Sequence, residues 1–586
     1  MLTPRPAPDL ATPAAGPTLP RRAGWGLAAG AAILLVIAAL LLAYLLTPYP
    51  ALRDWYLRRT PYLYRAASLP LDFFTPDVKA LGNLLAGLAL VGLGGVGAYG
   101  WWVLARRSVV VSPPLRLLRS ADLPLLAGLL LLAASLWAWG ATQVPPAYDE
   151  VFSAVYCAGN ESLFATWSYY MLPNNHVLFN LLNGGLFGWL RHLPWLVPTG
   201  RLLSGLAYAG TLLVIYRLVA SLTSQRGVGA LLAVLAGLQF SLWGFGFQAR
   251  GYALYALLHW IAVATLLAHW RQTWQNKWLP INALAVAAGY AVLPTFLFYH
   301  AAQLLAGVVV QLRERRFDGR FWRWQAGALA LAGAFYLPVI GFSGLGALVA
   351  NPYVRPFQGS LAEFVVNAWP DVKSYAPYAF GEIGLGPWSA YVLALVPLLL
   401  LAHRRYWQLG LLYLAWLLAV IGGTLGLRHV VFHRNLLALH SIAVVLAPFT
   451  VGVWMSRWRR WAGLAGALAV IVGVGLGFVR YNPVREPLAL YYYDLLGGFD
   501  AAQQRLAKLP ARATVAFSEE SFYPYYLYRR AGDTAPHPAQ RPAPAADYFL
   551  TAPSDVLPPA LAGHYQPVDT VGTYVLWRRQ FGILAP

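Results

Sequence analysis

The sequence predicts an all-α polytopic membrane protein with about thirteen membrane-spanning helices, an interfacial helix on the outer side and a small C-terminal α/β domain. Hydrophobic residues make up 59% of the 586 residues and charged residues only 11%, far below the share of about a quarter in globular domains. The apolar residues also form blocks of about 20, the length that one helix needs to cross a bilayer. These two observations exclude an assembly of soluble domains.

The thirteen predicted spans follow the apolar blocks. Residues 281–312 are long for one crossing and short for two, and basic residues flank them on both sides, so we expect a tight hairpin broken near Pro294. The spans are expected at residues 25–46, 80–104, 123–139, 202–220, 228–247, 252–270, a pair within 281–312, 327–342, 387–401, 409–425, 436–454 and 461–479.

The net charge of +21 does not indicate a nucleic-acid partner, because the basic residues form no single patch. They lie in short clusters between apolar blocks, at residues 106–107, 313–316, 404–405 and 457–460. Such clusters are typical of cytoplasmic loops, so the N-terminus is predicted inside a bacterial inner (plasma) membrane. The loop between the first two spans does not fit this orientation, because its five basic residues would lie outside. Cys157 is the single cysteine, so disulfides within the chain are excluded.

Four regions are predicted along the chain. Residues 1–22 are rich in Pro and Ala and are expected to be a disordered cytoplasmic N-terminus. Residues 23–119 hold two transmembrane helices, and residues 120–479 form the transmembrane core with an outer loop at 143–200. Residues 480–586 are richer in charge and proline and form the external α/β domain.

The C-terminal region shows short runs of two kinds. Those at 514–517, 548–550 and 573–577 are rich in β-forming residues, whereas 521–530 is helix-like. Strands and a helix mixed in this way predict a small α/β domain of about 100 residues.

The segment 174–190 is too polar for a span. His176, Asn180 and Asn183 follow i, i+4, i+7 spacing, and apolar side chains fill the other faces. This pattern is typical of an amphipathic helix that lies in the outer membrane interface.

Acidic residues are scarce in this chain. After Glu161 none occurs until Glu314, and none occurs from residue 383 through 485. No carboxylate lies in the middle of a predicted span, which is where proton-coupled transporters usually keep theirs. The carboxylates on the predicted outer face of the core are Asp149, Glu150, Glu161, Glu363, Asp371 and Glu382.

Asp149 and Glu150 directly follow a predicted span. A carboxylate at the membrane surface can act as a general base that takes a proton from an acceptor hydroxyl. Its neighbour can hold a divalent cation or tune its pKa, and no other cofactor is indicated. From position alone, the alternative is a pair of solvated residues at a helix start.

Six short motifs carry a resemblance to a known group. Tyr148-Asp149-Glu150 resembles the Tyr-Asp-Glu of bacterial GT-C glycosyltransferases, the group of glycosyltransferase family 39, the protein O-mannosyltransferases and the lipid A aminoarabinose transferase. Asn175-His176-Val177-Leu178 resembles its His-Pro-Pro-Leu helix start without the prolines. Arg201-Leu202-Leu203-Ser204 is similar to its Arg-Leu-Pro-Ser.

The later motifs follow in the same order. Residues 248–254, Gln-Ala-Arg-Gly-Tyr-Ala-Leu, resemble Gln-Glu-Ala-Arg-x-Tyr-Ala-Leu with one residue missing. Phe298-Tyr299-His300 resembles a Thr-His-Tyr hairpin tip, and Phe432-His433-Arg434-Asn435 resembles a late Arg-Tyr motif. Together the motifs cover about residues 120–450, so the two spans before residue 120 are extra.

The resemblance implies a GT-C-like fold and a polyprenyl-phosphate sugar donor. Asp149 would be the base, and Arg250 and Arg434 would clamp the donor phosphate, for which the bidentate guanidinium group is suited. The alternative for both arginines is snorkelling to lipid headgroups, and Arg201 begins a span where an anchoring arginine is ordinary. The predicted catalytic residues are Asp149 and Glu150, and the predicted donor- or acceptor-binding residues are Tyr148, His176, Arg201, Gln248, Arg250, Tyr252, His300 and Arg434.

The implied function is a hexosyl- or pentosyl-type glycosyltransferase of inverting mechanism. It would act on the outer, periplasmic face and transfer the sugar to a glycolipid, a polysaccharide or a protein, with membrane lipids as further partners. Two alternatives use the same cavity without chemistry. One is a transporter of lipid-linked glycans, and the other is an inactive structural subunit.

Overall fold

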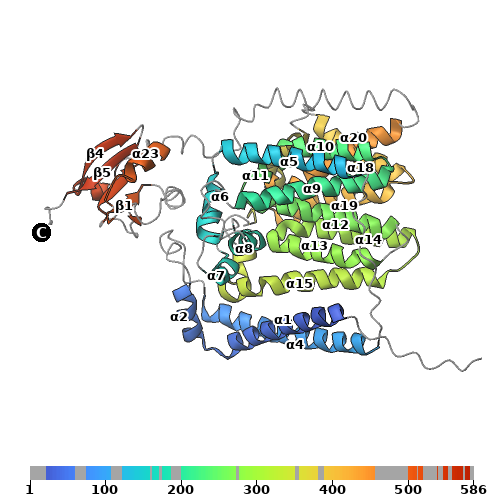
Figure 1. Cartoon of the computed structure of the whole chain (residues 1–586), viewed down its shortest axis with the longest axis horizontal. Helices are drawn as coiled ribbons and strands as arrows, with labels where there is room; N and C mark the ends of the chain where they lie inside the picture. The colour runs from blue at the N-terminus through green and yellow to red at the C-terminus, as the bar shows by residue number, and fades with distance from the viewer. Residues whose placement is uncertain are drawn as a thin grey trace, which may run out of the picture.

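The computed structural model shows a bundle of helices with a small mixed sheet beyond one end of it (Figure 1). Among the described residues, eight helices are long and apolar enough to cross a membrane, and up to ten if two bent pairs each count as one span. The protein is therefore a helical polytopic membrane protein with a C-terminal α/β domain. The structure describes residues 21–59, 74–106, 122–144, 146–158, 162–170, 175–186, 200–271, 276–349, 356–380, 388–455, 499–510, 512–518, 537–538, 546–551, 557, 559–571 and 574–580.

The core of the bundle is one large hydrophobic cluster, to which nearly all its helices contribute side chains. Helix α9 packs against α10 and α12, α12 against α13, and α14 against α19. The bundle helices are α5 (Leu123–Gln143), α9 (Gly200–Thr223), α10 (Arg226–Leu238), α11 (Phe240–Phe247), α12 (Tyr252–Arg271), α13 (Leu279–Val292), α14 (Leu297–Arg313), α15 (Gly319–Ser343), α17 (Leu361–Phe380), α18 (Ser389–Ala402), α19 (Trp407–Leu427) and α20 (Leu437–Met455).

The predicted break near Pro294 is confirmed. A short 3-10 turn, Pro294–Phe296, separates α13 from α14. The two helices run back along each other, because Asn282 near the start of α13 hydrogen-bonds Gln303 of α14 at 3.1 Å. The proline has no N–H for a continuous helix, and the chain turns at that position.

Two differences from the predicted spans stand out, and one predicted span is not tested. The block 228–247 forms two helices, because Gln239 has an extended backbone conformation and interrupts the helix between α10 and α11. Helix α17 lies between the spans predicted at 327–342 and 387–401, where no helix was predicted, and its Phe364 and Ala368 are buried. The span predicted at 461–479 lies outside the described residues, so the count of thirteen stays a prediction.

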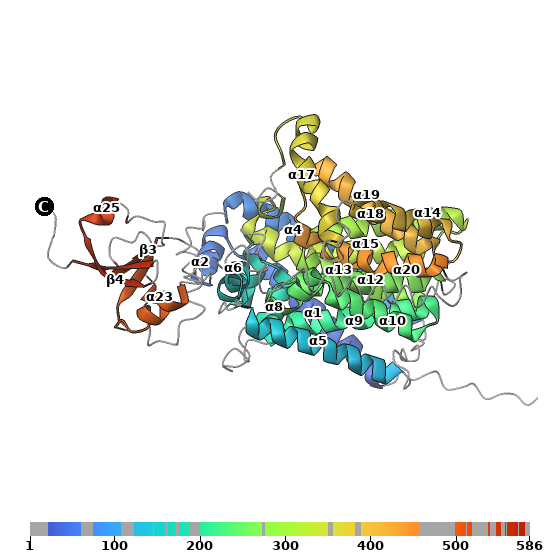
Figure 2. The same cartoon turned by 90° about the horizontal axis from the view of Figure 1, so that it is seen from above.

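One end of the bundle carries three short helices, α6 (Tyr148–Phe152), α7 (Leu163–Ser168) and α8 (Val177–Leu186). Figure 1 shows all three gathered there, and Figure 2 shows α6 and α8 at the same end. We call it the α6 end and the opposite one the far end. Helix α8 is the predicted amphipathic helix. Its polar side chains Asn180 and Asn183, and His176 just before it, are 1–5% exposed and face the protein interior.

The N-terminal unit consists of α1 (Arg21–Leu46), α2 (Tyr49–Arg59) and α4 (Pro76–Arg106), and α4 packs against both α1 and α15. The chain bends by 118° between α1 and α2. Helix α2 then meets α7, where Ser168 donates a hydrogen bond to the Tyr56 hydroxyl at 3.3 Å and Trp55 packs edge-on against Phe164. The unit preceding the core is thus joined to the helices of the α6 end.

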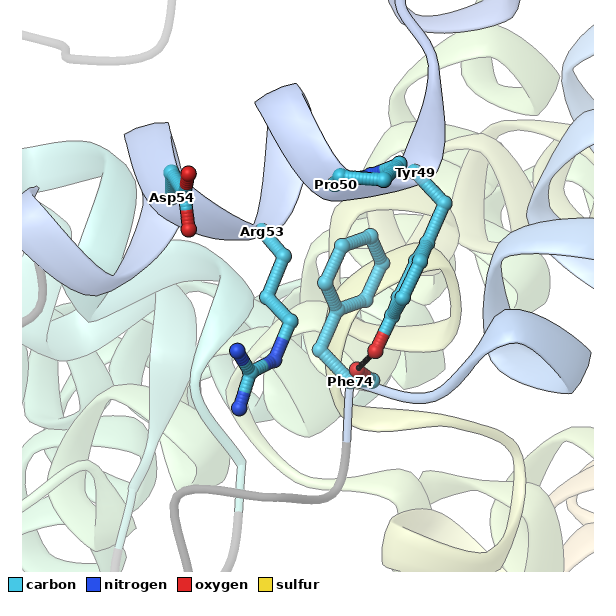
Figure 3. Close-up of a pocket in the computed structure, with 5 residues that line it drawn as sticks. All are labelled: Tyr49, Pro50, Arg53, Asp54 and Phe74. Carbon is cyan, nitrogen blue, oxygen red and sulfur yellow. Dashed lines mark hydrogen bonds between the residues drawn. The ribbon is translucent and has the colours of Figure 1, made fainter.

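A cavity of about 360 Å³ opens beside α2. Figure 3 shows the Arg53 side chain extending from α2 toward Phe74, and the Tyr49 hydroxyl donating to the Phe74 carbonyl oxygen. The cavity is lined by Tyr49, Pro50, Arg53, Asp54 and Phe74.

The C-terminal domain holds a five-stranded mixed sheet of order β2-β1-β3-β5-β4. Strand β1 is parallel to β2 and β3, whereas β5 is antiparallel to β3 and β4. The strand runs predicted at 514–517, 548–550 and 573–577 are confirmed, and the helix-like run 521–530 lies outside the described residues. The elements are α23 (Phe499–Leu506), β1 (Thr514–Phe517), β2 (His537–Pro538), β3 (Tyr548–Thr551), α25 (Pro559–Ala562), β4 (Tyr565–Val571) and β5 (Tyr574–Arg579).

This domain is linked to the bundle through α6. Val151 is fully buried in the same hydrophobic cluster as Phe499, Leu506 and Tyr574. Helix α6 therefore has one neighbour on each side, the membrane bundle and the C-terminal domain.

Candidate active site

The two carboxylates of helix α6 differ in their exposure to solvent. Glu150 is 0% exposed, whereas the Asp149 side chain is 21% exposed. They are adjacent in sequence, and a helical turn of 100° per residue separates their directions. The two residues that the sequence singled out together therefore have different surroundings.

Glu150 forms a buried bidentate ion pair with Arg201, the second residue of α9. Arg201 Nε lies 2.6 Å from Oε1 and Nη2 lies 2.9 Å from Oε2. The backbone N–H of Ala249 also donates to Oε1 at 3.0 Å, and that of Ala147 to Oε2 at 3.3 Å. Arg201 Nη1 donates to the carbonyl oxygens of Ala141 and Val144, each at 2.9 Å. This pair joins α5, α6, α9 and the 248–251 segment.

Asp149 lies between two arginines that come from distant parts of the chain. Arg434 Nη1 is 3.0 Å from Asp149 Oδ2, and Arg250 Nη2 is 3.6 Å from the same oxygen. Arg434 belongs to the 3-10 turn His433–Leu436 at the start of α20, and Arg250 lies two residues before the start of α12. The ends of the two predicted spans next to these arginines therefore meet at Asp149.

Arg250 is only 2% exposed, and its guanidinium and backbone carbonyl groups are hydrogen-bonded to neighbouring residues. Its Nη1 donates to the Asp149 carbonyl oxygen at 2.9 Å and to the Ser153 hydroxyl at 3.1 Å. The Ser204 hydroxyl donates to the Arg250 carbonyl oxygen at 3.1 Å. A buried guanidinium group is costly unless anions or acceptors surround it, so this arrangement fixes a positive charge at the α6 end.

His176 lies against the same arginine. Its Nδ1 accepts a hydrogen bond from the Gly251 N–H at 2.9 Å, and its ring meets the Tyr252 ring edge-on at 4.7 Å. Burial lowers the pKa of His176 well below its usual value, and the nearby charges of Arg250 and Arg434 lower it further. The ring is therefore neutral, and because Nδ1 is an acceptor, we assign the proton to Nε2.

The other predicted binding residues lie at different distances from this centre. Gln248 is buried at the end of α11, in the segment that carries Arg250. The side chain of Tyr148 lies outside the described part of the structure. His300 is not brought to Asp149, because its hydrogen-bond partners are Tyr290 of α13 and Gln325 of α15.

Sequence reasoning missed three contributors to the site. Ser153 and Ser204 hydrogen-bond Arg250. Ser204 ends the motif that begins at Arg201 but is not among the predicted site residues, and nothing in the sequence singles out Ser153. Gly251 is required by space, because a Cβ there would lie 2.5 Å from His176 Nδ1 and 2.8 Å from Val292 Cγ1. The signal for Gly251 was its place between Arg250 and Tyr252 in the 248–254 motif.

The charges of the site favour an anionic ligand. Glu150 and Arg201 neutralise each other and His176 is neutral, so the guanidinium groups of Arg250 and Arg434 outnumber the one carboxylate of Asp149. Among the described residues, no three His, Cys, Asp or Glu side chains gather as a metal site. The arrangement offers a partly exposed carboxylate that can accept a proton and two guanidinium groups that can bind phosphate.

No family model and no curated protein sequence matches the chain. Among solved structures it is similar to ArnT from Cupriavidus metallidurans bound to undecaprenyl phosphate, with 15% identity and a TM-score of 0.48 over 80% of this chain and 100% of that one. For the same protein in the apo state the values are 16%, 0.47, 78% and 98%. For the arabinosyltransferase EmbB from Mycobacterium smegmatis they are 14%, 0.40, 68% and 45%.

Proposed function

We propose that this protein is a membrane glycosyltransferase that moves a hexose or pentose from a polyprenyl-phosphate donor to an acceptor hydroxyl. The observation that carries the proposal is the Asp149 carboxylate between Arg250 and Arg434 at the α6 end. A lipid-linked phosphate at the membrane surface needs a cationic clamp, and an acceptor hydroxyl needs a base beside it. The site offers both within one cluster of side chains.

Asp149 is assigned the role of general base. It takes the proton of the acceptor hydroxyl while the acceptor oxygen attacks the anomeric carbon and polyprenyl phosphate leaves from the opposite side. Arg250 and Arg434 stabilise the negative charge that develops on the leaving phosphate. Glu150 and Arg201 act by position, since they hold α6 and the 248–251 segment in register. The acceptor is a glycolipid, a polysaccharide or a protein on the outer side of the inner membrane.

The test is a reaction with purified protein in lipid nanodiscs, a panel of polyprenyl-phosphate sugars and candidate acceptors. We expect release of polyprenyl phosphate together with a glycosylated acceptor, both detected by mass spectrometry. A transporter or an inactive subunit would leave the donor intact even with every acceptor present. Donor cleavage that persists undiminished in Asp149→Asn would contradict the role of Asp149.

A further inference from the structure

The Asp149 carboxylate stands where an anionic ligand of the two arginines is expected. Arg250 and Arg434 both approach one oxygen, Oδ2, at 3.6 and 3.0 Å. Guanidinium groups bind carboxylate and phosphate oxygens with the same planar geometry. Carboxylate and donor phosphate are therefore competitors for the same pair of cations.

His176 adds a third donor beside them. Its Nε2 lies 3.4 Å from Arg250 Nη2, and with Nδ1 accepting from Gly251, Nε2 carries a hydrogen. Two N–H donors do not bond to each other, so both are suited to share an acceptor oxygen supplied by a ligand. The site thus has more hydrogen-bond donors than the Asp149 carboxylate alone uses.

We propose, resting on the function proposed above, that the Asp149 carboxylate occupies the phosphate-binding position of the two arginines while the site is empty. The donor must then bind before Asp149 can act as the base. On binding, the phosphate replaces the Asp149 carboxylate as the ion-pair partner of Arg250 and Arg434, and His176 Nε2–H donates a further hydrogen bond to it. Asp149, released from the two cations, then faces the acceptor. The reaction is ordered, with the donor first, and the base is blocked in the empty enzyme.

The charges balance along this sequence. Before transfer, the Asp149 carboxylate and the phosphodiester each carry one negative charge. The acceptor O–H proton passes to Asp149, the acceptor oxygen bonds to the anomeric carbon, and the bond from that carbon to the phosphate oxygen breaks with its electron pair on oxygen. Asp149 loses the negative charge that the leaving phosphate gains. Two guanidinium groups match the total before and after the step, so the net charge of the site does not change.

The test is the affinity of undecaprenyl phosphate for wild type and for Asp149→Asn in nanodiscs, each normalised to folded protein. If the carboxylate competes with phosphate, removing its charge tightens binding by about tenfold or more, and Asp149→Ala does the same. Undecaprenol, which lacks the phosphate, binds wild type and variants alike. Glu363→Gln is the matched control, because Glu363 is an exposed carboxylate whose partner is the Ser360 N–H at 2.7 Å.

The outcomes separate the two proposals. Equal or weaker binding in both Asp149 variants, with binding still weakened by Arg250→Ala and Arg434→Ala, overturns the competition and leaves the donor class standing. Absence of undecaprenyl phosphate binding in wild type and variants overturns the donor class and, with it, the ordered mechanism. Tighter binding of undecaprenol as well as of its phosphate also overturns the competition, because the gain would then not depend on charge.

Discussion

Two aspartates near the ends of α5 each meet two arginines, and the difference between them separates an anchor from a site. Asp122, directly before α5, lies 2.7 Å from Arg217 and 3.0 Å from Arg226. Its side chain is 2% exposed, whereas those of the two arginines are 38% and 43% exposed. At the α6 end the most enclosed charge is an arginine, because the Arg250 side chain is 2% exposed, whereas those of Asp149 and Arg434 are 21% and 38% exposed.

The position of the buried charge explains the difference. At the far end the carboxylate is enclosed, also accepts from the Tyr216 hydroxyl at 3.0 Å, and ties the start of α5 to α9 and α10. At the α6 end one cation, Arg250, is enclosed and the carboxylate is partly exposed, as the proposed exchange of Asp149 for a lipid-linked phosphate requires. The same three charges therefore stabilise the fold at one end and are suited to bind a ligand at the other.

The largest expected effect distinguishes the two aspartates directly. Asp149→Asn should lower turnover by at least about 10²-fold, the usual scale for loss of a general base. Asp122→Asn should leave turnover per folded molecule close to wild type and lower stability by about 1–3 kcal/mol, because it weakens buried hydrogen bonds to charged groups. Turnover and thermal unfolding of both variants check this, and equal loss of turnover in the two would remove the contrast.

The next effect concerns the arginines. Arg250→Ala and Arg434→Ala should weaken donor use by roughly 10- to 150-fold, since each loses a charge-assisted hydrogen bond worth about 1.5–3 kcal/mol. Lysine variants should fall between, because lysine keeps the charge and loses the planar contact. Arg217→Ala at the far end is the matched control and should not change donor use. Donor titration measures all five variants, and lysine equal to arginine at both positions would favour snorkelling instead.

A smaller effect is expected from glycines at the two ends. Gly251→Ala places a Cβ within 2.5 Å of His176 Nδ1 and should cost about 1–3 kcal/mol of stability, as overpacking usually does. Gly227→Ala, beside Arg226, meets no heavy atom within 4 Å among the described residues and should be neutral or slightly stabilising. Thermal unfolding of both variants gives the comparison. A harmless Gly251→Ala would show that the α6 end is not closely packed around His176.

The smallest effect is on pH dependence. Burial and the charges of Arg250 and Arg434 lower the pKa of His176 in the folded protein. In the unfolded chain this pKa is about 6.5, so below that pH the unfolded chain binds a proton that the folded protein does not bind. The stabilising contribution of neutral His176 is complete above that pH and is lost as the pH falls, by up to about 1.4 kcal/mol per pH unit. His176→Gln should therefore lose stability less steeply than wild type between pH 6.5 and 5. Parallel stability curves for the two proteins would mean that His176 is not held neutral.

The sequence by itself determined the class of protein and the order of its elements. Apolar blocks of bilayer length fixed most of the helices, the proline at 294 fixed a hairpin, and three β-rich runs fixed strands of the C-terminal sheet. These features depend on local composition and periodicity, which act over one element at a time. The scarcity of acidic residues also directed attention to Asp149 and Glu150, which do lie at one end of the bundle.

Only the tertiary structure decided which residues meet. Glu150 and Arg201, Asp149 and Arg434, and Arg250 and His176 are separated by 51, 285 and 74 positions, and no periodicity relates such residues. Their pairing follows from how α6, α9, α12 and α20 pack, which also buries Glu150 and leaves its neighbour accessible. Burial sets whether a charge anchors the fold or exchanges partners, because the cost of an unpaired charge depends on the solvent that it has lost.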